Sequence, residues 1–340
     1  MTGRRITISD VANAAGVSKA TVSYVLNNRR HGVRISQNTE RKVLEVCRTL
    51  NYRPAAAAIL LANRRKARLR LRVFSPWLYA QFSDLMHIFN RALQRRERET
   101  PLDISFRQYT RDELSRHLGA AAVRSCDAIL ILGSSPTDDR WLAAHADRLT
   151  SVVLLNRQVA GITSASGGDD AAMLELVRRI DVPHYRRVCA VVSGAFSSCQ
   201  KLRQEGFAAG VAEAGGTVEE LSEVTDTEDL WRRIASRLKA AERLLVYLPD
   251  FVMAARLMKR AQEEGVAIPE ELGIVTCDRH SLLSPFLSPA LTTMCPDLDR
   301  MSDTALELAC RVAERRTPQT VVVPGTPMPG GTTVNRRKTA

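Results

Sequence analysis

The stretch ITISDVANAAGVSKATVSYVLN, residues 6–27, decides the fold of the N-terminal region because it predicts two short helices joined by a tight turn. Thr7 can cap the first helix, and Asp10 follows it at the spacing of a capping box. Gly16 supplies a turn residue that accepts a positive φ without a steric penalty. Ser18 is a favoured N-cap for the second helix.

The second helix has two different faces. At 100° per residue, Val22, Val25 and Leu26 share one face. The opposite face carries Lys19, Ala20, Ser23, Tyr24 and Asn27. A short helix that buries aliphatic groups and exposes hydroxyl, amide, basic and aromatic groups suits the major groove of DNA. The alternative is an amphipathic helical hairpin whose polar face is merely solvated.

The positive charge of the chain is concentrated next to this hairpin. Residues 1–72 hold 16 Lys and Arg against 3 Asp and Glu, a net charge of +13, whereas the remaining 268 residues hold 33 against 34, a net charge of −1. A segregated excess of this size is the electrostatic footprint of a protein that binds a polyanion.

Composition excludes several other classes of protein. The chain begins without an apolar signal segment and has no apolar run near 18 residues, so we expect a cytoplasmic protein with no membrane contact. The 7 cysteines are scattered and never in CxxC spacing, which favours free buried thiols over disulfides or a metal site. No P-loop, GxGxxG or GxSxG motif occurs, so we expect no cofactor and no catalytic residues.

The region after the hairpin completes a small helical domain. Ser36 can cap a third helix from about Gln37 to Leu50, and Pro54 is well placed to begin a further helix, PAAAAILLAN. Isolated helices of this length are marginal in water. We therefore expect a hinge segment that is ordered only when docked, the alternative being a linker helix that always packs on the larger domain.

From residue 69 onward, apolar runs alternate with helical patterns. The runs lie at 69–74, 102–106, 127–132, 151–155, 188–192, 244–248, 272–276 and 320–323. The helical patterns lie at about 81–97, 111–123, 138–147, 170–180, 199–214, 227–241, 250–264 and 297–315. This alternation predicts an α/β fold of doubly wound parallel sheets in two lobes, with a ligand at the carboxyl ends of the strands between the lobes.

Taken together, these segments resemble the lactose/galactose repressor family of bacterial transcription regulators. The resemblance rests on ISDVANAAGVSKATVSYVLNN, TERKVLEVCRTLNYRPAAAA, EGFAAGVAEAG at 205–215, IPEELGIVTCD at 268–278 and LSPALTT at 287–293. Tyr24, the loop NNRRHGVRIS and GGDDAAMLELVRRI at 167–180 look most like the fructose-repressor branch.

The resemblance implies three parts: a helix-turn-helix headpiece, a hinge helix and a two-lobed core like that of periplasmic binding proteins. We expect the headpiece at 1–53, the hinge helix and basic linker at 54–67, and the core at 68–333. Within the core we expect lobe 1 at about 68–160 and 293–318, and lobe 2 at about 161–292 and 319–333.

The resemblance also implies how the protein meets DNA. Lys19, Ala20 and Tyr24 would face base edges. The phosphate contacts would come from Thr7, Ser18, Thr21, Ser23, Asn27, Ser36 and Thr39. Leu61, flanked by Ala58 and Ala62, would enter the minor groove at the operator centre. Tyr24 could instead pack on the headpiece, and Leu61 could be an ordinary linker residue.

The effector site is where the chain departs from its family. Arg203 occupies the position of an arginine that commonly binds effector hydroxyl or phosphate groups, and we expect it to bind an anionic ligand, the alternative being a surface ion pair. Asp278, Asp250 and Asn156 stand at strand ends that carry binding residues in relatives. Trp77 could stack on a sugar ring or fill space between the lobes. Pro249 and Pro296 replace a family Asn and Gln, which puts the usual neutral-sugar site in doubt.

The resemblance therefore predicts a regulator that is a repressor of carbohydrate-metabolism genes. It would bind an operator in double-stranded DNA as a homodimer, with a tetramer possible, under the control of a sugar or sugar-phosphate effector. The alternatives are a regulator of this fold that answers to a protein partner, and a sugar-binding protein or enzyme with an accessory N-terminal domain.

Overall fold

The computed structural model divides the chain into two compact units, Met1–Leu69 and Arg70–Ala340. The structure describes residues 7–26, 35–50, 52, 68–76, 83–119, 122–123, 125–192, 197–240, 243–278, 283–312 and 317–336.

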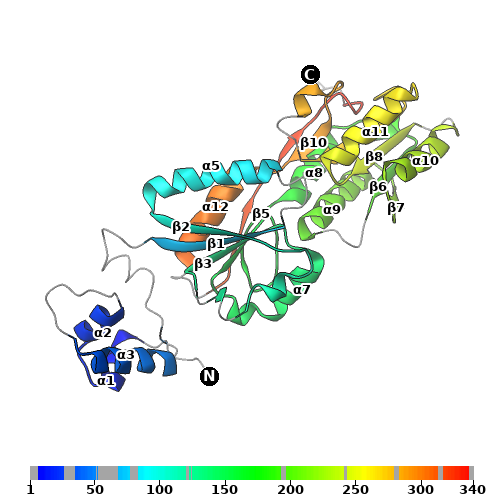
Figure 1. Cartoon of the computed structure of the whole chain (residues 1–340). Coiled ribbons are helices and arrows are strands. Elements are labelled where there is room, and N and C mark those ends of the chain that lie inside the picture. Colours follow the sequence, from blue (N-terminus) through cyan, green and yellow to red (C-terminus); the bar gives the residue numbers. More distant parts are fainter. Residues whose placement is uncertain are drawn as a thin grey trace. The chain divides into compact units, whose positions relative to one another are not determined.

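The first unit contains three helices, which are α1 (Ile8–Ala15), α2 (Lys19–Leu26) and α3 (Gln37–Thr49) (Figure 1). The turn between α1 and α2 uses Gly16 at φ 64°, as the sequence predicts. The helices enclose a small core of Val11, Ala12, Ala15, Val22, Val43 and Cys47. This core fixes the crossing of α1 and α2 and therefore the direction of the outer face of α2.

The first sheet of the larger unit has the strand order β11-β5-β4-β3-β1-β2. Its strands are β1 (Leu69–Ser75), β2 (Leu102–Gln108), β3 (Ala128–Leu132), β4 (Val152–Leu155), β5 (Thr163–Gly167) and β11 (Thr320–Val323). The pairs from β1 through β3, β4 and β5 to β11 are parallel. The carboxyl ends of these strands therefore lie at one edge of the sheet.

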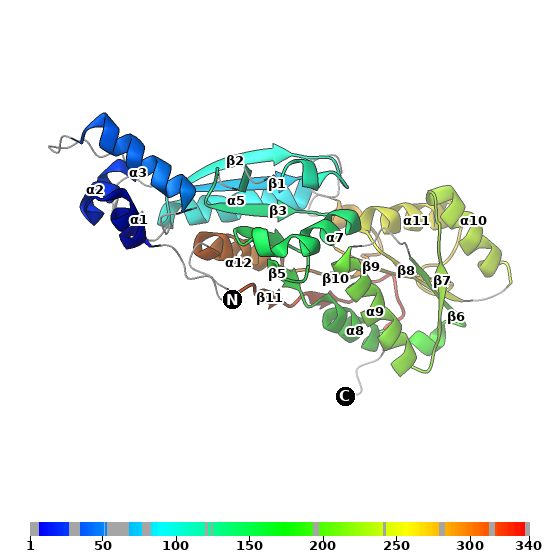
Figure 2. The same cartoon turned by 90° about the horizontal axis from the view of Figure 1, so that it is seen from below.

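Helices α5 (Ser83–Glu99) and α12 (Leu298–Arg311) lie side by side on this first lobe (Figures 1 and 2). Exposed ion pairs join them, including Arg91 with Asp299 at 3.0 Å and Arg95 with Asp303 at 2.9 Å. Helix α7 (Pro136–Ala144) follows β3 and begins with a capping box at Ser135.

The second sheet has the order β12-β10-β9-β8-β6-β7. Its strands are β6 (Arg187–Val191), β7 (Val218–Leu221), β8 (Leu244–Leu248), β9 (Leu272–Cys277), β10 (Thr292–Cys295) and β12 (Thr326–Met328). Within this sheet β12 runs antiparallel to β10, whereas the pairs β10–β9, β9–β8, β8–β6 and β6–β7 are parallel.

Helices cover both faces of the second sheet. They are α8 (Asp169–Arg178), α9 (Ser198–Glu213), α10 (Thr227–Leu238) and α11 (Phe251–Glu263). Alternate residues of one strand enter different cores, since Val246 packs with α10 and α11 whereas Tyr247 packs with α8 and α9. The predicted doubly wound α/β fold is confirmed.

Most predicted strands are present, and those that the sequence missed share a cause. Strand β5 has the sequence TSASG, which lacks large apolar side chains although every residue is buried. The others are β7, with two Glu among four residues, and the short β10 and β12. Short strands of small or polar residues leave no apolar run to detect, whether they are buried, as β5 is, or partly exposed, as β7 and β12 are.

The predicted helix at 111–123 is wrong over most of its length. The segment forms the 3₁₀ turn η2 (Leu114–Arg116), and Asp112 has a positive φ of 72°. The carboxylate of Asp138 explains the difference, because it accepts hydrogen bonds from the backbone amides of Asp112 at 3.2 Å and Leu114 at 3.1 Å.

The predicted lobe boundaries also need correction. Residues 161–167 and 319–323 belong to the first lobe, because β5 pairs with β4 and β11 pairs with β5. Residues 293–295 belong to the second lobe, because β10 pairs with β9. The chain thus crosses between the lobes after β5, β10 and β11. No described helix is long and apolar enough to cross a membrane.

Candidate functional site

Local hydrogen bonds fix the start of each headpiece helix. At α1, the Thr7 hydroxyl accepts from the Asp10 amide at 3.3 Å, and the Thr7 amide donates to the Asp10 carboxylate at 2.7 Å. The predicted capping box is confirmed. Such caps leave the remaining amides of the first turn pointing outward, which is an arrangement that favours anions.

Two Ser–Thr pairs repeat this arrangement at α2 and α3. The Thr21 amide donates to the Ser18 hydroxyl at 3.0 Å, and the Thr39 amide donates to the Ser36 hydroxyl at 3.1 Å. The hydroxyls within each pair also bond, at 2.9 Å and 2.8 Å. Four of the predicted phosphate ligands are thus held in fixed positions at helix starts.

The outer face of α2 presents the predicted base-reading residues. Lys19 and Ala20 are exposed, and Ser23 and Tyr24 are half-buried, while Val22 is completely buried on the other side. The structure therefore places these side chains at the surface but does not test their contacts with DNA. The predictions for Asn27, Ala58, Leu61 and Ala62 lie outside the described residues.

In the larger unit, three predicted effector residues lie just beyond the carboxyl ends of inner strands. Asn156 follows β4, Asp250 follows β8 and Asp278 follows β9. Asn156 and Asp278 have positive φ values of 56° and 70°. Left-handed backbone at non-glycine residues is concentrated at functional sites. Trp77 lies outside the described residues.

Arg203, on α9, is part of a buried ionic cluster and not a surface ion pair. Its Nε donates to Asp169 at 2.8 Å, and its Nη1 donates to Asp278 at 3.3 Å. Burial opposes the charge of Arg203, but Asp278 and Asp169 outweigh it and hold the pKa of the guanidinium well above its ordinary value. Asp278 is the accessible member, since 43% of its side chain is exposed against 4% for Arg203 and none for Asp169.

Asp169 is a residue that the sequence reasoning missed. It is the first residue of α8, where a carboxylate is favoured by the helix dipole. A Cβ atom on Gly167 would collide with the Asp169 carboxylate, so this position requires glycine. The signal was present in the segment GGDD, in which a glycine pair precedes acidic residues at a helix start.

Two polar atoms of this cluster are buried without a hydrogen-bond partner in the described part of the chain. They are Nη2 of Arg203 and Oδ1 of Asp169. An unpartnered buried donor or acceptor is costly, so such atoms in a native site need an explanation.

Asp250 caps α11 and accepts a hydrogen bond from the Met253 amide at 2.9 Å. Burial raises the pKa of its carboxyl above the ordinary value for Asp, and the charge of Asp278 adds to this effect. Asp250 therefore lies near the Arg203 cluster, in the same lobe.

Asn156 meets the start of α9 from the other lobe. Its backbone carbonyl accepts a hydrogen bond from the Cys199 thiol at 3.2 Å. Close by, the Gln158 amide donates to the Ser198 hydroxyl at 3.1 Å. The structure thus brings Asn156, Arg203, Asp250 and Asp278 to facing edges of the two lobes.

The edge of the first sheet also carries polar groups that the sequence reasoning did not single out. Ser75 ends β1 and Tyr109 follows β2, and the hydroxyls of both are buried without a hydrogen-bond partner among the described residues. Arg157 is buried and donates to the backbone carbonyls of Ser134 at 3.0 Å and Asn156 at 2.6 Å. Nothing in the sequence marked these residues, since each is an isolated polar residue at a strand end.

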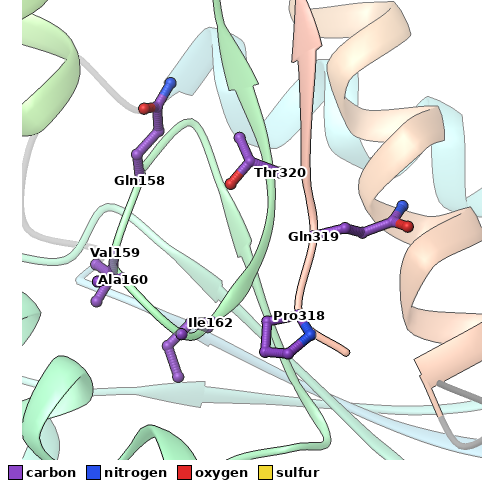
Figure 3. A pocket seen from close by; sticks show the side chains of 8 residues that line it. Gln158, Val159, Ala160, Ile162, Pro318, Gln319 and Thr320 are labelled. Atoms are coloured by element: carbon purple, nitrogen blue, oxygen red, sulfur yellow. The ribbon is translucent and has the colours of Figure 1, made fainter. Parts of the chain in front are cut away.

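A pocket of about 270 Å³ lies between the β4–β5 loop and the start of β11, toward the amino-terminal ends of β5 and β11 (Figure 3). Its lining consists of Gln158, Val159, Ala160, Gly161, Ile162, Pro318, Gln319 and Thr320. These residues include no ionisable side chain and none of the predicted effector residues. Nor do the described residues contain a group of His, Cys, Asp or Glu arranged to hold a metal ion.

Each of the two units contains a region that matches a known protein family. Residues 7–55 match the family described as bacterial regulatory proteins, lacI family, and residues 182–333 match the periplasmic binding protein-like domain. The chain belongs to the LacI family. Members of this family are transcriptional regulators, and this chain is a DNA-binding regulator and not an enzyme.

Individual LacI-family proteins are similar over nearly the whole chain. The HTH-type transcriptional regulator GalS of Salmonella typhimurium is 28% identical over 91% of this chain and 90% of its own length. The lac repressor dimer bound to operator and an anti-inducer has a TM-score of 0.62 and 19% identity, over 97% of this chain and 100% of that one. The complex of the regulator CelR with cellobiose has a TM-score of 0.60 and 17% identity, over 96% and 100%.

Proposed function

We propose that this LacI-family regulator represses carbohydrate-metabolism genes by binding a pseudo-palindromic operator as a homodimer. A sugar or sugar-phosphate effector between the lobes would control it. The observation that carries the DNA-binding part is the outer face of α2, whose other face packs in the buried core of the headpiece and whose start is capped by Ser18. The +13 charge of residues 1–72 supports it, because phosphate contacts supply much of the affinity for DNA.

Two similar solved structures support DNA and a sugar-like effector as the ligands. One neighbouring structure holds operator DNA and an anti-inducer, and another holds cellobiose. In this chain we propose that the effector contacts the pair Arg203 and Asp278 in one lobe and Asn156 in the facing lobe. An effector there would favour one arrangement of the lobes, and the linked change in headpiece spacing would alter operator affinity. We place the protein in the cytoplasm, in contact with the nucleoid.

Base reading by Tyr24 can be tested directly. We expect Tyr24→Ala to weaken binding to an operator selected from random DNA by about 1–3 kcal/mol, the size of one good base contact. Binding to random DNA should be nearly unchanged. Fluorescence anisotropy with both DNAs at one salt concentration measures this difference. If both affinities fall equally, Tyr24 positions the protein on the backbone and does not read bases.

Exposed apolar side chains on the larger unit support the homodimer. Phe286 is 84% exposed, and Leu283 beside it is 47% exposed. Aromatic residues dominate the energetics of protein interfaces, and exposed apolar patches mark binding sites. We propose that Phe286 packs against a second copy of this chain.

We expect Phe286→Ser to weaken dimerisation by about 2–4 kcal/mol, the range of interface hot spots. Sedimentation velocity at a series of protein concentrations gives the dissociation constant. Val322→Ser is the matched control, since Val322 is also exposed, at 53%, but lies on edge strand β11 of the other sheet. An unchanged dimer in Phe286→Ser would place the interface elsewhere.

A regulator of the same fold that answers to a protein partner is the second candidate. Pro249 and Pro296, which replace polar residues of the family pattern, favour it. A thermal-shift screen of free sugars and sugar phosphates separates the two candidates, because a ligand at 100 times its dissociation constant adds about 2.7 kcal/mol of stability. If no compound stabilises the protein, the partner-controlled regulator is the better description.

A further inference from the structure

We infer that the Arg203 subsite binds uncharged hydroxyl groups and excludes phosphate, with Asp169 acting as a positioning residue that sets this preference. The inference deepens the proposed function and rests on it, since it assumes that an effector reaches Arg203. Asp169 had no assigned role in either the sequence pattern or the family resemblance.

The first observation is the charge balance around the guanidinium. Arg203 carries one positive charge, and the carboxylates of Asp169 and Asp278 bind it at 2.8 Å and 3.3 Å. The trio therefore has a net charge of −1 before any ligand arrives, and Asp250 lies close enough to interact with Asp278. A phosphate placed at Arg203 would meet this surplus negative charge in a buried environment, where repulsion is poorly screened.

The second observation is the geometry of the donors. Nε of Arg203 donates to Asp169, which is fully buried, and Nη1 donates to Asp278, whose side chain is half-exposed. Nη2 is the donor that remains without a partner in the described part of the chain. A hydroxyl group can accept from Nη2 and donate to the exposed carboxylate of Asp278, because it is both a donor and an acceptor. A phosphate group brings negatively charged oxygens next to the two carboxylates, and these oxygens repel them.

The third observation is the way in which Asp169 is held. Gly167 leaves room for its carboxylate, and the start of α8 favours its charge. Asp169 is therefore held 2.8 Å from Nε of Arg203, where it prevents the guanidinium from turning toward an incoming anion.

The test uses inorganic phosphate as the probe and the full-length protein. Melting temperatures are compared in phosphate and in chloride at equal ionic strength, for the wild type, Asp278→Asn and Asp169→Asn/Asp278→Asn. We expect no specific stabilisation of the wild type. We expect the double variant to bind phosphate at least tenfold more tightly than the wild type, and Asp278→Asn, which changes a half-exposed side chain, to show a smaller gain in the same direction.

Two controls connect the result to the subsite. Asp170→Asn changes the exposed neighbour on α8 and should behave as the wild type. Adding Arg203→Gln to the double variant should abolish the gain. The inference is overturned if the wild type binds phosphate through Arg203, or if removing both carboxylates gives no gain. Far-UV circular dichroism shows whether each variant is folded.

A second measurement separates positioning from a general structural role. For a sugar identified by the screen described above, Asp169→Asn should weaken binding of the free sugar tenfold or more and should weaken its monophosphate less. Equal losses for both would mean that Asp169 only stabilises the fold. If the screen finds no ligand, the effector part of the proposed function fails, whereas the phosphate experiment still decides the charge preference of Arg203.

Discussion

The headpiece and the interlobe edge place functional side chains in opposite ways. In the headpiece, the candidate contacts at the helix starts are fixed by bonds three residues along the chain, such as Ser18 with Thr21 and Ser36 with Thr39. At the interlobe edge, Arg203 is fixed by residues 34 and 75 positions away, and these partners are carboxylates. The headpiece thus presents hydroxyl groups that are held by neighbours close in sequence. In the core, the charge of Arg203 is already compensated by carboxylates from distant parts of the chain.

We expect the largest loss of stability when one member of the buried Arg203 cluster is removed. Arg203→Ala would leave Asp169 as a fully buried carboxylate without its cation, so we expect a loss of about 3–5 kcal/mol in the free energy of unfolding of the core. Urea unfolding measures this loss. The control Arg178→Ala breaks an exposed pair with Glu213, which water and salt screen, and should leave the free energy of unfolding nearly unchanged. Equal losses in the two variants would show that the Arg203 cluster is not structurally important.

The headpiece should respond to smaller and more local changes. Ser18→Ala removes the cap of α2, and we expect the headpiece to lose about 1 kcal/mol of stability. Ser18→Asp keeps a capping oxygen but adds a negative charge where we expect DNA phosphate. It should therefore retain stability and lose DNA affinity, as measured by thermal unfolding and anisotropy. If Ser18→Asp binds DNA normally, Ser18 is a cap and not a phosphate ligand.

The smallest expected effect is the contribution of Asp250 to the pH dependence of folding stability. Its folded-state pKa lies above the ordinary value of 3.8, so the folded protein retains this proton at pH values where the unfolded chain has released it. Stability from this group is therefore lost as the pH rises above about 3.8 and through the higher folded-state pKa. Asp250→Asn preserves an N-cap and removes the titration. Its melting temperature relative to the wild type should rise between pH 4 and pH 7, and a constant difference would contradict the prediction.

The same contrast explains what the sequence could predict. The capping box at Thr7, the turn at Gly16 and the buried Val22 follow from patterns only a few residues long, and the structure confirms them. The doubly wound sheets were also predictable, because strands such as β8 (LLVYL) are continuous apolar runs.

The interlobe cluster could be predicted only in part. The resemblance indicated Arg203 and Asp278, but it could not show that the two bind each other or that Asp169 completes the cluster. Such contacts depend on how α8, α9 and β9 pack, which no local pattern records. The lobe boundaries failed for a similar reason, since the small residues of β5 gave no sign that the strand is buried in the first sheet.

The position of Asp169 has a mechanical consequence. It lies two residues after β5, at the point where the chain first crosses from one lobe to the other. Its bond to Arg203 therefore attaches the proposed effector subsite to a crossover between the lobes rather than to the outer end of either lobe. A displacement applied close to a pivot produces a larger angle than the same displacement applied farther away. A small ligand at Arg203 would therefore act on a short lever arm, and the ends of the lobes would move farther than the ligand.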